Sequence, residues 1–446
     1  MSTIAAISTP FGNGGIAVIR ISGEEAFCVT DRVFTCQAAK RLFEVSANTV
    51  VFGKVHDSNG QIIDQALVTV FHAPHSYTGE DTVEISCHGG ILVAKKVLKA
   101  VLEAGASLAE RGEFSKRAFL NGKMDLSQAE GIVDLIHSVS DRGAKVAATQ
   151  MEGRLSKNIQ AMRERLLNLV SHLEAAADFP EEDILELTDT EVKNEIEKIS
   201  TQMKQLIRTA DYGKILKDGF PVAVIGKPNV GKSSLLNCLS GQERAIVTDV
   251  AGTTRDVIEE YINLDGFAIR LMDTAGIRRT ADQVETIGVE KSKAAAVDAS
   301  LVLCVFDASS PMDREDQVIL NLIQDKNHII VLNKCDQGKQ IELEGIEISA
   351  KEGTGLDRLI QEISRKIQMG TAGQEEDVIT NERHYECLLR SREALEHAYE
   401  SIMANMPVDL VAIDLQQSIE ALGEIVGLTV SEEIVDRIFH NFCLGK

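Results

Sequence analysis

The chain has 446 residues, of which 44% are hydrophobic and 26% charged, a composition typical of a globular protein with two or three domains. Its formal net charge of −22 argues against indiscriminate binding of nucleic acid or of an anionic membrane surface. A local basic patch could still contact RNA, and Arg111, Lys116 and Arg117 are the candidates for it.

Cysteine usage and the absence of long apolar runs predict the compartment. The eight cysteines are scattered, with no C-x-x-C pair and no zinc-like spacing, as in proteins of a reducing compartment. We find no N-terminal targeting pattern and no run of ~18 apolar residues, the usual minimum for a membrane span. We therefore expect a cytoplasmic protein that does not associate with membranes.

Residues 1–120 are predicted to form a small α/β domain. The segments 16–21 (IAVIRI) and 82–86 (TVEIS) are typical of strands. The run 91–102 has apolar residues at helical spacing.

The rest of the chain is predicted to be a helical domain with an α/β domain inserted into it. Residues 121–215 and 372–446 have the pattern of long amphipathic helices, whereas 216–371 alternate apolar runs of strand length with helical segments. That alternation is typical of a mostly parallel sheet. Because helices precede and follow it, we expect the 216–371 domain to interrupt one helical domain at an exposed loop.

The strongest motif is G-x-x-x-x-G-K-S at residues 226–233, which follows the apolar strand 222–225 and opens a helix. The glycines let backbone amides surround phosphate oxygens, and the helix N-terminus adds partial positive charge. Lys232 is expected to reach the β- and γ-phosphates and Ser233 to ligate Mg²⁺. The inserted domain is thus predicted to be a P-loop α/β domain.

Three further motifs follow strands in the order that guanine-nucleotide binding requires. In the sequence 273–276 (DTAG), the aspartate can hold Mg²⁺ through water and the glycine amide can contact the γ-phosphate. In 333–336 (NKCD), Asp336 can accept hydrogen bonds from the guanine N1–H and the N2 amine, which adenine lacks, and so select GTP over ATP. Residues 349–351 (SAK) would support the base.

The sequence 252–256 (GTTRD) is the predicted first switch, in which Thr254 would complete the Mg²⁺ shell when γ-phosphate is present. Ile277 follows the DTAG motif, at the position where signalling GTPases carry a water-orienting glutamine. Isoleucine cannot orient water. Either hydrolysis is very slow, or another group and a cation perform this task.

These motifs resemble the branch of GTPases that contains the bacterial tRNA-modification, Era and EngA proteins. Segments outside the inserted domain narrow the resemblance: 3–10 (TIAAISTP), 77–81 (YTGED), 88–90 (HGG), 111–123 (RGEFSKRAFLNGK) and the ending 437–446 (RIFHNFCLGK). They resemble the MnmE (TrmE) family, GTPases of tRNA uridine-34 modification. The resemblance covers the whole chain, and the terminal cysteine-aliphatic-glycine-lysine motif is highly specific.

The resemblance implies an activity and its partners. MnmE-like proteins form homodimers through an N-terminal domain that binds 5-formyltetrahydrofolate or a related tetrahydrofolate. Their G domains dimerise across the nucleotide face during hydrolysis, with K⁺ in the place of an arginine finger. With an FAD-containing MnmG-type protein, in a heterotetramer or larger complex, they add an aminomethyl or carboxymethylaminomethyl group to C5 of uridine 34 in certain tRNAs. An acidic chain fits a partner that carries most of the RNA surface.

The resemblance also assigns residues, by their positions in the family motifs. The implied catalytic residues are Lys232, Thr254 and Glu285, of which Glu285 positions the attacking water indirectly. The implied Mg²⁺ ligands are Ser233 and Thr254, and the implied K⁺ ligands are Asn229, Thr248, Val250 and Thr253. A fixed cation near the β–γ bridge would offset developing charge, which would make up for the missing glutamine.

The GTP-binding residues that the motifs and the resemblance imply together are Asn229, Val230, Gly231, Lys232, Ser233, Ser234, Thr248, Asp249, Val250, Ala251, Gly252, Thr253, Thr254, Asp273, Thr274, Ala275, Gly276, Asn333, Lys334, Asp336, Ser349, Ala350 and Lys351.

The implied folate-binding residues are Arg20, Glu84, Lys123 and Lys446. Glu84 suits the pteridine's amide-like donors, and the cations suit the carboxylates of the glutamate tail. Without the family, Arg20, Glu84 and Lys123 would be interpreted as surface ion-pairing residues, and Glu285 as a solvated helix residue. Cys443 either packs inertly or has a role in the modification.

Two other functions remain open. One is a ribosome-assembly or membrane-linked GTPase switch that modifies nothing. A single G domain followed by helices disfavours it, since Era-like proteins carry a KH domain and EngA-like proteins two G domains. The other is a folate-dependent enzyme with a regulatory GTPase, which retained modification without GTP hydrolysis would support.

Overall fold

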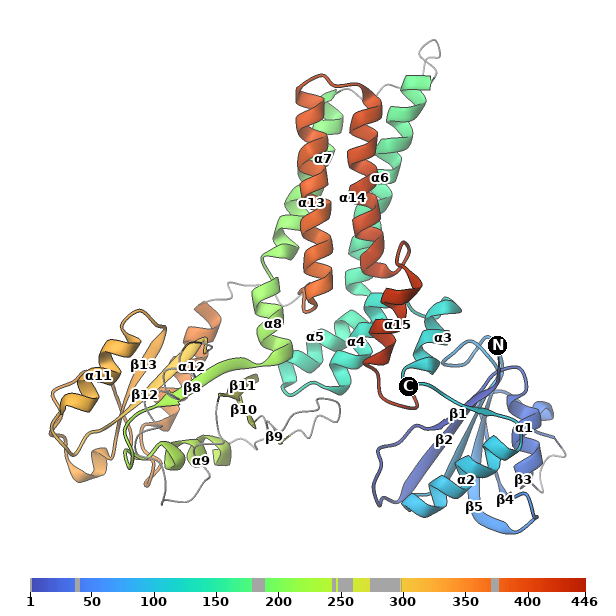
Figure 1. Ribbon diagram of the computed structural model, residues 1–446, viewed down its shortest axis with the longest axis horizontal. Coiled ribbons are helices and arrows are strands. Elements are labelled where there is room, and N and C mark those ends of the chain that lie inside the picture. Colours follow the sequence, from blue (N-terminus) through green and yellow to red (C-terminus); the bar gives the residue numbers. More distant parts are fainter. Residues whose placement is uncertain are drawn as a thin grey trace. The chain divides into compact units, whose positions relative to one another are not determined.

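The computed structural model describes residues 2–36, 41–178, 189–242, 246–247, 260–272, 297, 299–369 and 377–446 (Figure 1). Contacts within the chain form two compact units. The first contains Met1–Val133, Met151–Arg165 and Ile419–Lys446, and the second contains Asp134–Gln150 and Leu166–Ser418. We describe each unit by itself.

A seven-stranded sheet of order β3-β4-β5-β6-β2-β1-β7 forms the N-terminal part of the first unit. Its pairs are antiparallel except β1–β7. Its strands are β1 (Ile4–Ile7), β2 (Ile16–Ser22), β3 (Phe34–Cys36), β4 (Thr49–His56), β5 (Ile62–Phe71), β6 (Thr82–His88) and β7 (Ser107–Leu108). The strands expected at 16–21 and 82–86 are confirmed.

Helices cover one face of this sheet, and on the opposite face Ile4 and Ala6 of β1 are buried against Phe114. The helices α1 (Ala26–Val33) and α2 (Ile91–Glu103) share a buried core with alternate residues of β2, β5 and β6, and η1 (Leu42–Glu44) adds to it. The helix expected at 91–102 is therefore confirmed. Because strand side chains alternate between faces, the intervening residues Arg20 and Glu84 lie on the outer face.

The remaining helices of the first unit surround the chain's C-terminus. They are α3 (Glu113–Leu120), α15 (Glu432–His440) and parts of α4 (Leu126–Ile136), α6 (Arg154–Asp178) and α14 (Val408–Val426). Leu126 of α4 packs with Phe439 and Phe442, and the Phe439 ring is also 6.1 Å from the Phe119 ring of α3. This aromatic cluster fixes the end of the chain beside α3.

The second unit contains a sheet of order β14-β13-β12-β8-β11-β10-β9. The strands from β14 to β11 are parallel to their neighbours, and β10 and β9 are antiparallel. The strands are β8 (Phe220–Ile225), β9 (Ile246–Val247), β10 (Glu260–Leu264), β11 (Phe267–Leu271), β12 (Leu301–Asp307), β13 (His328–Asn333) and β14 (Ile346–Glu347). The mostly parallel sheet expected from the sequence is confirmed.

Helices α9 (Lys232–Gln242), α11 (Arg314–Ile323) and α12 (Leu356–Met369) and the short helix η3 (Cys335–Gln337) belong to this sheet domain. Asp313 begins α11 with a capping box, in which its side chain accepts from the Asp316 amide and the Asp316 side chain accepts from the Asp313 amide.

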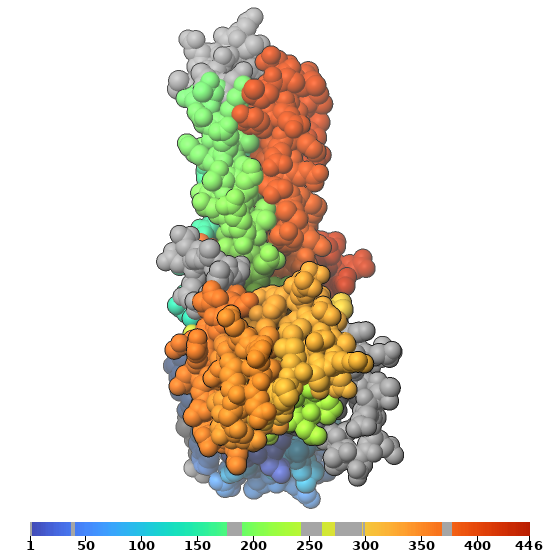
Figure 2. Space-filling view, turned by 90° about the vertical axis from the view of Figure 1, so that its left-hand side faces the viewer, coloured from blue at the N-terminus to red at the C-terminus, as the bar shows by residue number. Residues whose placement is uncertain are grey.

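The other helices of the second unit are α5 (Asp141–Met151), α7 (Asp189–Ile207), α8 (Ala210–Asp218) and α13 (Glu382–Met403). Helices α7 and α13 pack along their length, and Figure 2 shows them side by side. Ser391 of α13 donates a hydrogen bond to the Ser418 carbonyl of α14 at 3.0 Å. The expected multidomain fold, with two α/β parts and an all-α part, is confirmed. No helix in the described part of the chain is long and apolar enough to cross a membrane.

Candidate functional site

The loop between β8 and α9 has the backbone that phosphate binding requires. Gly231 adopts a left-handed φ of +96°, and a Cβ there would lie 2.2 Å from Nδ2 of Asn333. Only glycine fits both restrictions. Asn229 also has a positive φ, of +64°, and its side chain is exposed at the bend of the loop. Val230 between them is buried and anchors the loop in the core.

Lys232 turns its side chain back into this loop. Its Nζ donates hydrogen bonds to the carbonyls of Gly226 and Lys227, both at 2.7 Å. Burial lowers the pKa of Lys232 below its usual range. The next two residues, Ser233 and Ser234, are exposed on the first turn of α9, where the Ser233 hydroxyl is accessible to a cation.

Asn333 joins three of the predicted motifs. Its Nδ2 donates to the Val230 carbonyl at 2.8 Å, and its Oδ1 accepts from the Ala350 amide at 3.0 Å. The side chain is 2% exposed, so these bonds are shielded from water. The phosphate loop and both guanine-recognition segments are therefore held together by one buried amide.

The guanine-recognition segments place one acidic side chain in solvent. Asp336 is exposed in η3, whereas Ser349 and Ala350 are buried and Lys351 is exposed. The Cys335 amide donates to the Ile348 carbonyl at 3.1 Å, which fixes η3 beside the 349–351 segment. The Asp336 carboxylate is thus accessible to a base.

Asp307 is a residue of this site that the sequence motifs did not identify. It ends β12, the strand between β8 and β13, and its Oδ2 accepts from Nζ of Lys334 at 2.5 Å. Burial raises the pKa of Asp307, but hydrogen bonds from Lys334 and Ser309 outweigh it, and the pKa lies below its usual value. The position of Asp307 at the carboxyl end of a parallel strand is the pattern that could have revealed it.

Several predicted residues lie outside the described part of the chain. They are Thr248, Asp249, Val250, Ala251, Gly252, Thr253, Thr254, Asp273, Thr274, Ala275, Gly276, Ile277 and Glu285.

A second candidate site lies on the outer face of the N-terminal sheet. Nε of Arg20 donates to Oε1 of Glu84 at 2.9 Å, and Nη2 forms an ion pair with the same oxygen at 2.8 Å, as expected for directly paired residues of β2 and β6. The Arg20 guanidinium carbon also lies 5.0 Å from the Tyr77 ring centre and 5.7 Å from that of Phe114. The aromatic rings and Glu84 fix the guanidinium in one place.

The C-terminal residues return to this sheet. The Ser8 hydroxyl donates to the Gly445 carbonyl at 3.0 Å. Gly445 has a φ of +89°, and a Cβ there would lie 2.3 Å from the Ile7 carbonyl oxygen. Burial and the charge of Arg20 lower the pKa of Lys446, whereas Cys443, which is exposed, raises it. Arg20, Glu84 and Lys446 are therefore brought together from three parts of the chain.

Lys123 contacts the loop that carries Tyr77. Its Nζ donates to the Pro74 carbonyl at 2.9 Å, and a Cβ at Gly79 would lie 3.3 Å from its Cγ. Lys123 is thus connected to the Arg20 cluster through the 74–80 loop.

The basic patch suggested by the sequence is wrong for two of its three residues. The Arg117 side chain is 5% exposed and pairs with Glu80 and Glu113 at 3.1 and 2.7 Å. Lys116 pairs with Asp436. Their charges are neutralised within the protein, and only Arg111 is exposed.

Known proteins match this chain over its whole length. Residues 3–123 match the family model described as GTP-binding protein TrmE N-terminus, and residues 126–443 match that of the MnmE helical domain. Proteins named tRNA modification GTPase MnmE are 46% identical in Acetivibrio thermocellus, 46% in Geobacillus kaustophilus and 44% in Clostridioides difficile. Each alignment covers 100% of this chain and 99% of the relative. The chain belongs to the MnmE family.

Proposed function

We propose that this chain is a GTPase of tRNA modification, which hydrolyses GTP and takes part in adding an aminomethyl or carboxymethylaminomethyl group to C5 of wobble uridine 34 in certain tRNAs. The observation that carries the GTPase activity is the buried Asn333 amide, which binds the phosphate loop to the guanine-recognition segments. The names of relatives aligned over 99% of their length support the tRNA-modification role.

At the nucleotide site, Lys232 contacts the β- and γ-phosphates, Asp336 binds guanine, and Ser233 and Thr254 hold Mg²⁺. Mg²⁺ supplies charge for the developing negative oxygens. The exposed Ser233 hydroxyl, one residue after Lys232, suits this ligand role. The other GTP-binding residues keep the roles that their motifs predict.

Hydrolysis depends on K⁺ and on association of two G domains. Asn229 supports this proposal, because its positive φ holds an exposed amide oxygen at the bend of the phosphate loop. Thr248, Val250 and Thr253 complete the K⁺ site, and Glu285 positions the attacking water. Ile277 cannot orient water, so a cation and another group, here the Glu285 carboxylate, are needed.

The Arg20 cluster binds 5-formyltetrahydrofolate or a related tetrahydrofolate, with Lys123 at its edge. Arg20 and Lys446 bring two positive charges against the single negative charge of Glu84. An anionic glutamate tail would offset the excess positive charge, and the second Glu84 oxygen remains available to pteridine donors. Cys443 is exposed and raises the pKa of Lys446, which supports a role for this thiol at the site.

The N-terminal sheet forms the homodimer contact through its outer face. Val50, Phe52 and Leu67 are 53%, 60% and 47% exposed, and Phe52 lies directly opposite Leu67 on the neighbouring strand. They share this face with Arg20 and Glu84, so a second copy would cover apolar surface beside the folate site.

An FAD-containing MnmG-type protein is the proposed partner, in a heterotetramer or larger complex, and it supplies most of the tRNA contact. The net charge of −22 and the neutralised Lys116 and Arg117 support this division, since tRNA affinity depends on cationic contacts to phosphate. We propose three domains: a folate-binding and dimerisation domain at 1–120, a G domain at 216–371, and a helical domain split between 121–215 and 372–446. The proposed location of the protein is the cytoplasm.

The activity is tested by measuring GTP turnover in KCl and in NaCl. We expect faster turnover in KCl, loss of that difference in Asn229→Ala, and loss of turnover in both salts in Lys232→Ala. Asn237→Ala changes an exposed asparagine of α9 and should behave like the unmodified protein. Equal rates in the two salts would rule out the potassium proposal, and absence of GTP turnover would rule out the GTPase itself.

A further inference from the structure

Arg142 of helix α5 contacts the hairpin of β10 and β11, beside the apolar contacts of Val146 with the same core. The guanidinium carbon of Arg142 lies 4.2 Å from the ring centre of Phe267, the first residue of β11, which is 1% exposed. Gly266 in the hairpin turn has a φ of +80°, and a Cβ there would lie 3.3 Å from Nε of Arg142. The arginine therefore follows the surface of the turn and places its charge over the ring.

The same ring is contacted by a second helix, and the two helices pack tightly together. The Tyr212 ring of α8 meets Phe267 edge-on at 6.5 Å. A Cβ at Gly143 of α5 would lie 2.5 Å from the Leu216 carbonyl oxygen of α8, so the two helices are in close contact at this glycine. Hairpin, α5 and α8 thus form one packed block, which transmits displacement rather than absorbing it.

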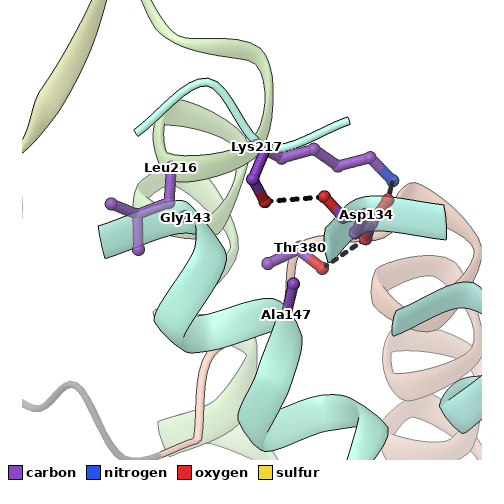
Figure 3. A pocket seen from close by; sticks show the side chains of 7 residues that line it. Asp134, Gly143, Ala147, Leu216, Lys217 and Thr380 are labelled. Carbon is purple, nitrogen blue, oxygen red and sulfur yellow. Dashed lines mark hydrogen bonds and ion pairs between the residues drawn. The ribbon is translucent and has the colours of Figure 1, made fainter. Parts of the chain in front are cut away.

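Both connections of the inserted domain contact Asp134 of α4, which lies beside α5 in the sequence (Figure 3). Asp134 of α4 pairs with Lys217, just before β8, at 2.9 Å, and accepts from Thr380, just before α13, at 3.4 Å. The Ile379 amide donates to the Thr209 hydroxyl at 3.0 Å. The exit is thus held to the start of α8, and Asp134 of α4 links the exit to the entry.

In the sequence, the β10–β11 hairpin lies between the predicted first switch and the DTAG motif. Glu260 begins β10 four residues after the predicted first switch at 252–256, and Leu271 ends β11 two residues before Asp273. A change at either switch segment is therefore connected by a short length of chain to the strand whose first side chain lies under Arg142.

We propose that Arg142 is a positioning residue that couples the nucleotide state of the G domain to α5 through its contact with Phe267. The proposal rests on the proposed GTP site. Because coupling between two sites is reciprocal, α5 in turn biases the relative affinity of the G domain for GTP and GDP.

Hydrogen–deuterium exchange of residues 141–151 tests this coupling, in the full chain with GDP and with a non-hydrolysable GTP analogue. Affinities for both nucleotides are measured in parallel. Arg142→Ala removes the cation, Phe267→Leu removes the ring but keeps apolar bulk, and Arg142→Lys keeps a cation. Arg314→Ala is the matched control, because Arg314 is exposed on α11. Thermal unfolding checks that each variant is folded.

We expect the exchange difference between the two nucleotide states to fall below about half its original size in Arg142→Ala and Phe267→Leu, with Arg142→Lys intermediate and Arg314→Ala unchanged. The double variant of Arg142→Ala and Phe267→Leu should lose no more of the exchange difference than either single variant, because the two substitutions break the same contact. Two results would overturn the coupling. One is an undiminished exchange difference in folded Arg142→Ala, and the other is no exchange difference between the GDP-bound and the analogue-bound forms of the unmodified protein. Failure of either nucleotide to bind would instead refute the proposed function.

Discussion

Asp336 is the residue on which the proposed base selection depends, and its exposure makes it a suitable target for substitution. In Asp336→Asn we expect GTP binding to weaken by about 1–3 kcal/mol, because guanine donors lose a charged acceptor. An asparagine amide can also donate, so xanthine nucleotides, which carry an oxygen at C2, should gain affinity. Calorimetric titration with both nucleotides measures this. Asp357→Asn, an exposed acid of α12, is the control, and unchanged GTP affinity would refute the role of Asp336.

Lys446 is the residue that most directly tests the folate site. In Lys446→Ala we expect affinity for 5-formyltetrahydrofolate to fall by roughly 1.5–3 kcal/mol, the usual contribution of a charge-assisted hydrogen bond. Lys99→Ala, an exposed lysine of α2, is the control. Equilibrium dialysis measures both variants, and equal affinities in the two would contradict the assignment.

The pH dependence of folate binding follows from the same lysine. Burial and Arg20 lower the pKa of Lys446, so its charge is lost at a lower pH than that of an ordinary lysine. Because the charged form binds a carboxylate, affinity should be present below this lowered pKa and decline as pH rises through it. Lys446→Ala should lack that decline. A decline of the same size in the variant would assign the titration to another group.

At the scale of single residues, the sequence predicts those residues whose role depends on the spacing of a short motif. Lys232 and Asn333 belong to short motifs after strands, and each donates a hydrogen bond to a carbonyl of the phosphate loop. Asp307 lies in no such motif, and only its place at the end of β12 points to it, whereas Tyr77 could not be selected because Arg20 comes from a distant segment. Arg117 was misjudged because a basic residue type does not reveal burial against two carboxylates.

At the scale of single elements, the outer face of the N-terminal sheet makes a separate prediction. Phe52→Ser with Leu67→Ser should leave the fold intact, since both side chains are exposed, and should shift the protein from dimer toward monomer. Sedimentation equilibrium over a concentration range measures the shift. Leu92→Ser, an exposed position of α2, should not change association. A dimer of unchanged affinity in the double variant would place the contact elsewhere.

Strands and helices with a clear hydrophobic period could be predicted from the sequence, but the elements that pack against them could not. Alternation in β2 and helical spacing in α2 gave both elements within a residue or two of their observed ends. The sequence gives no comparable indication that α5 lies against the β10–β11 hairpin, because Arg142 has the pattern of an ordinary solvated arginine. Such contacts depend on packing between elements far apart in the chain.

At the scale of the whole molecule, the two ends of the chain meet in one unit. Residues 419–446 are grouped with the N-terminal sheet, and the aromatic cluster of Phe439 and Phe442 explains why. The terminal C-L-G-K motif therefore contributes Lys446 to the proposed folate site, whose Arg20 and Glu84 lie in the first 90 residues. The resemblance anticipated that grouping, whereas composition and periodicity could not.

The central claim is that GTP hydrolysis by this chain drives modification of wobble uridine, and nucleoside mass spectrometry of tRNA tests it most directly. In cells lacking the protein, C5-modified uridines should disappear. They should return with the unmodified gene and with Asn237→Ala, but not with Lys232→Ala. Retained modification with folded Lys232→Ala would show a folate-dependent enzyme that does not need its GTPase. An unchanged tRNA profile in the deletion would contradict the modification function altogether.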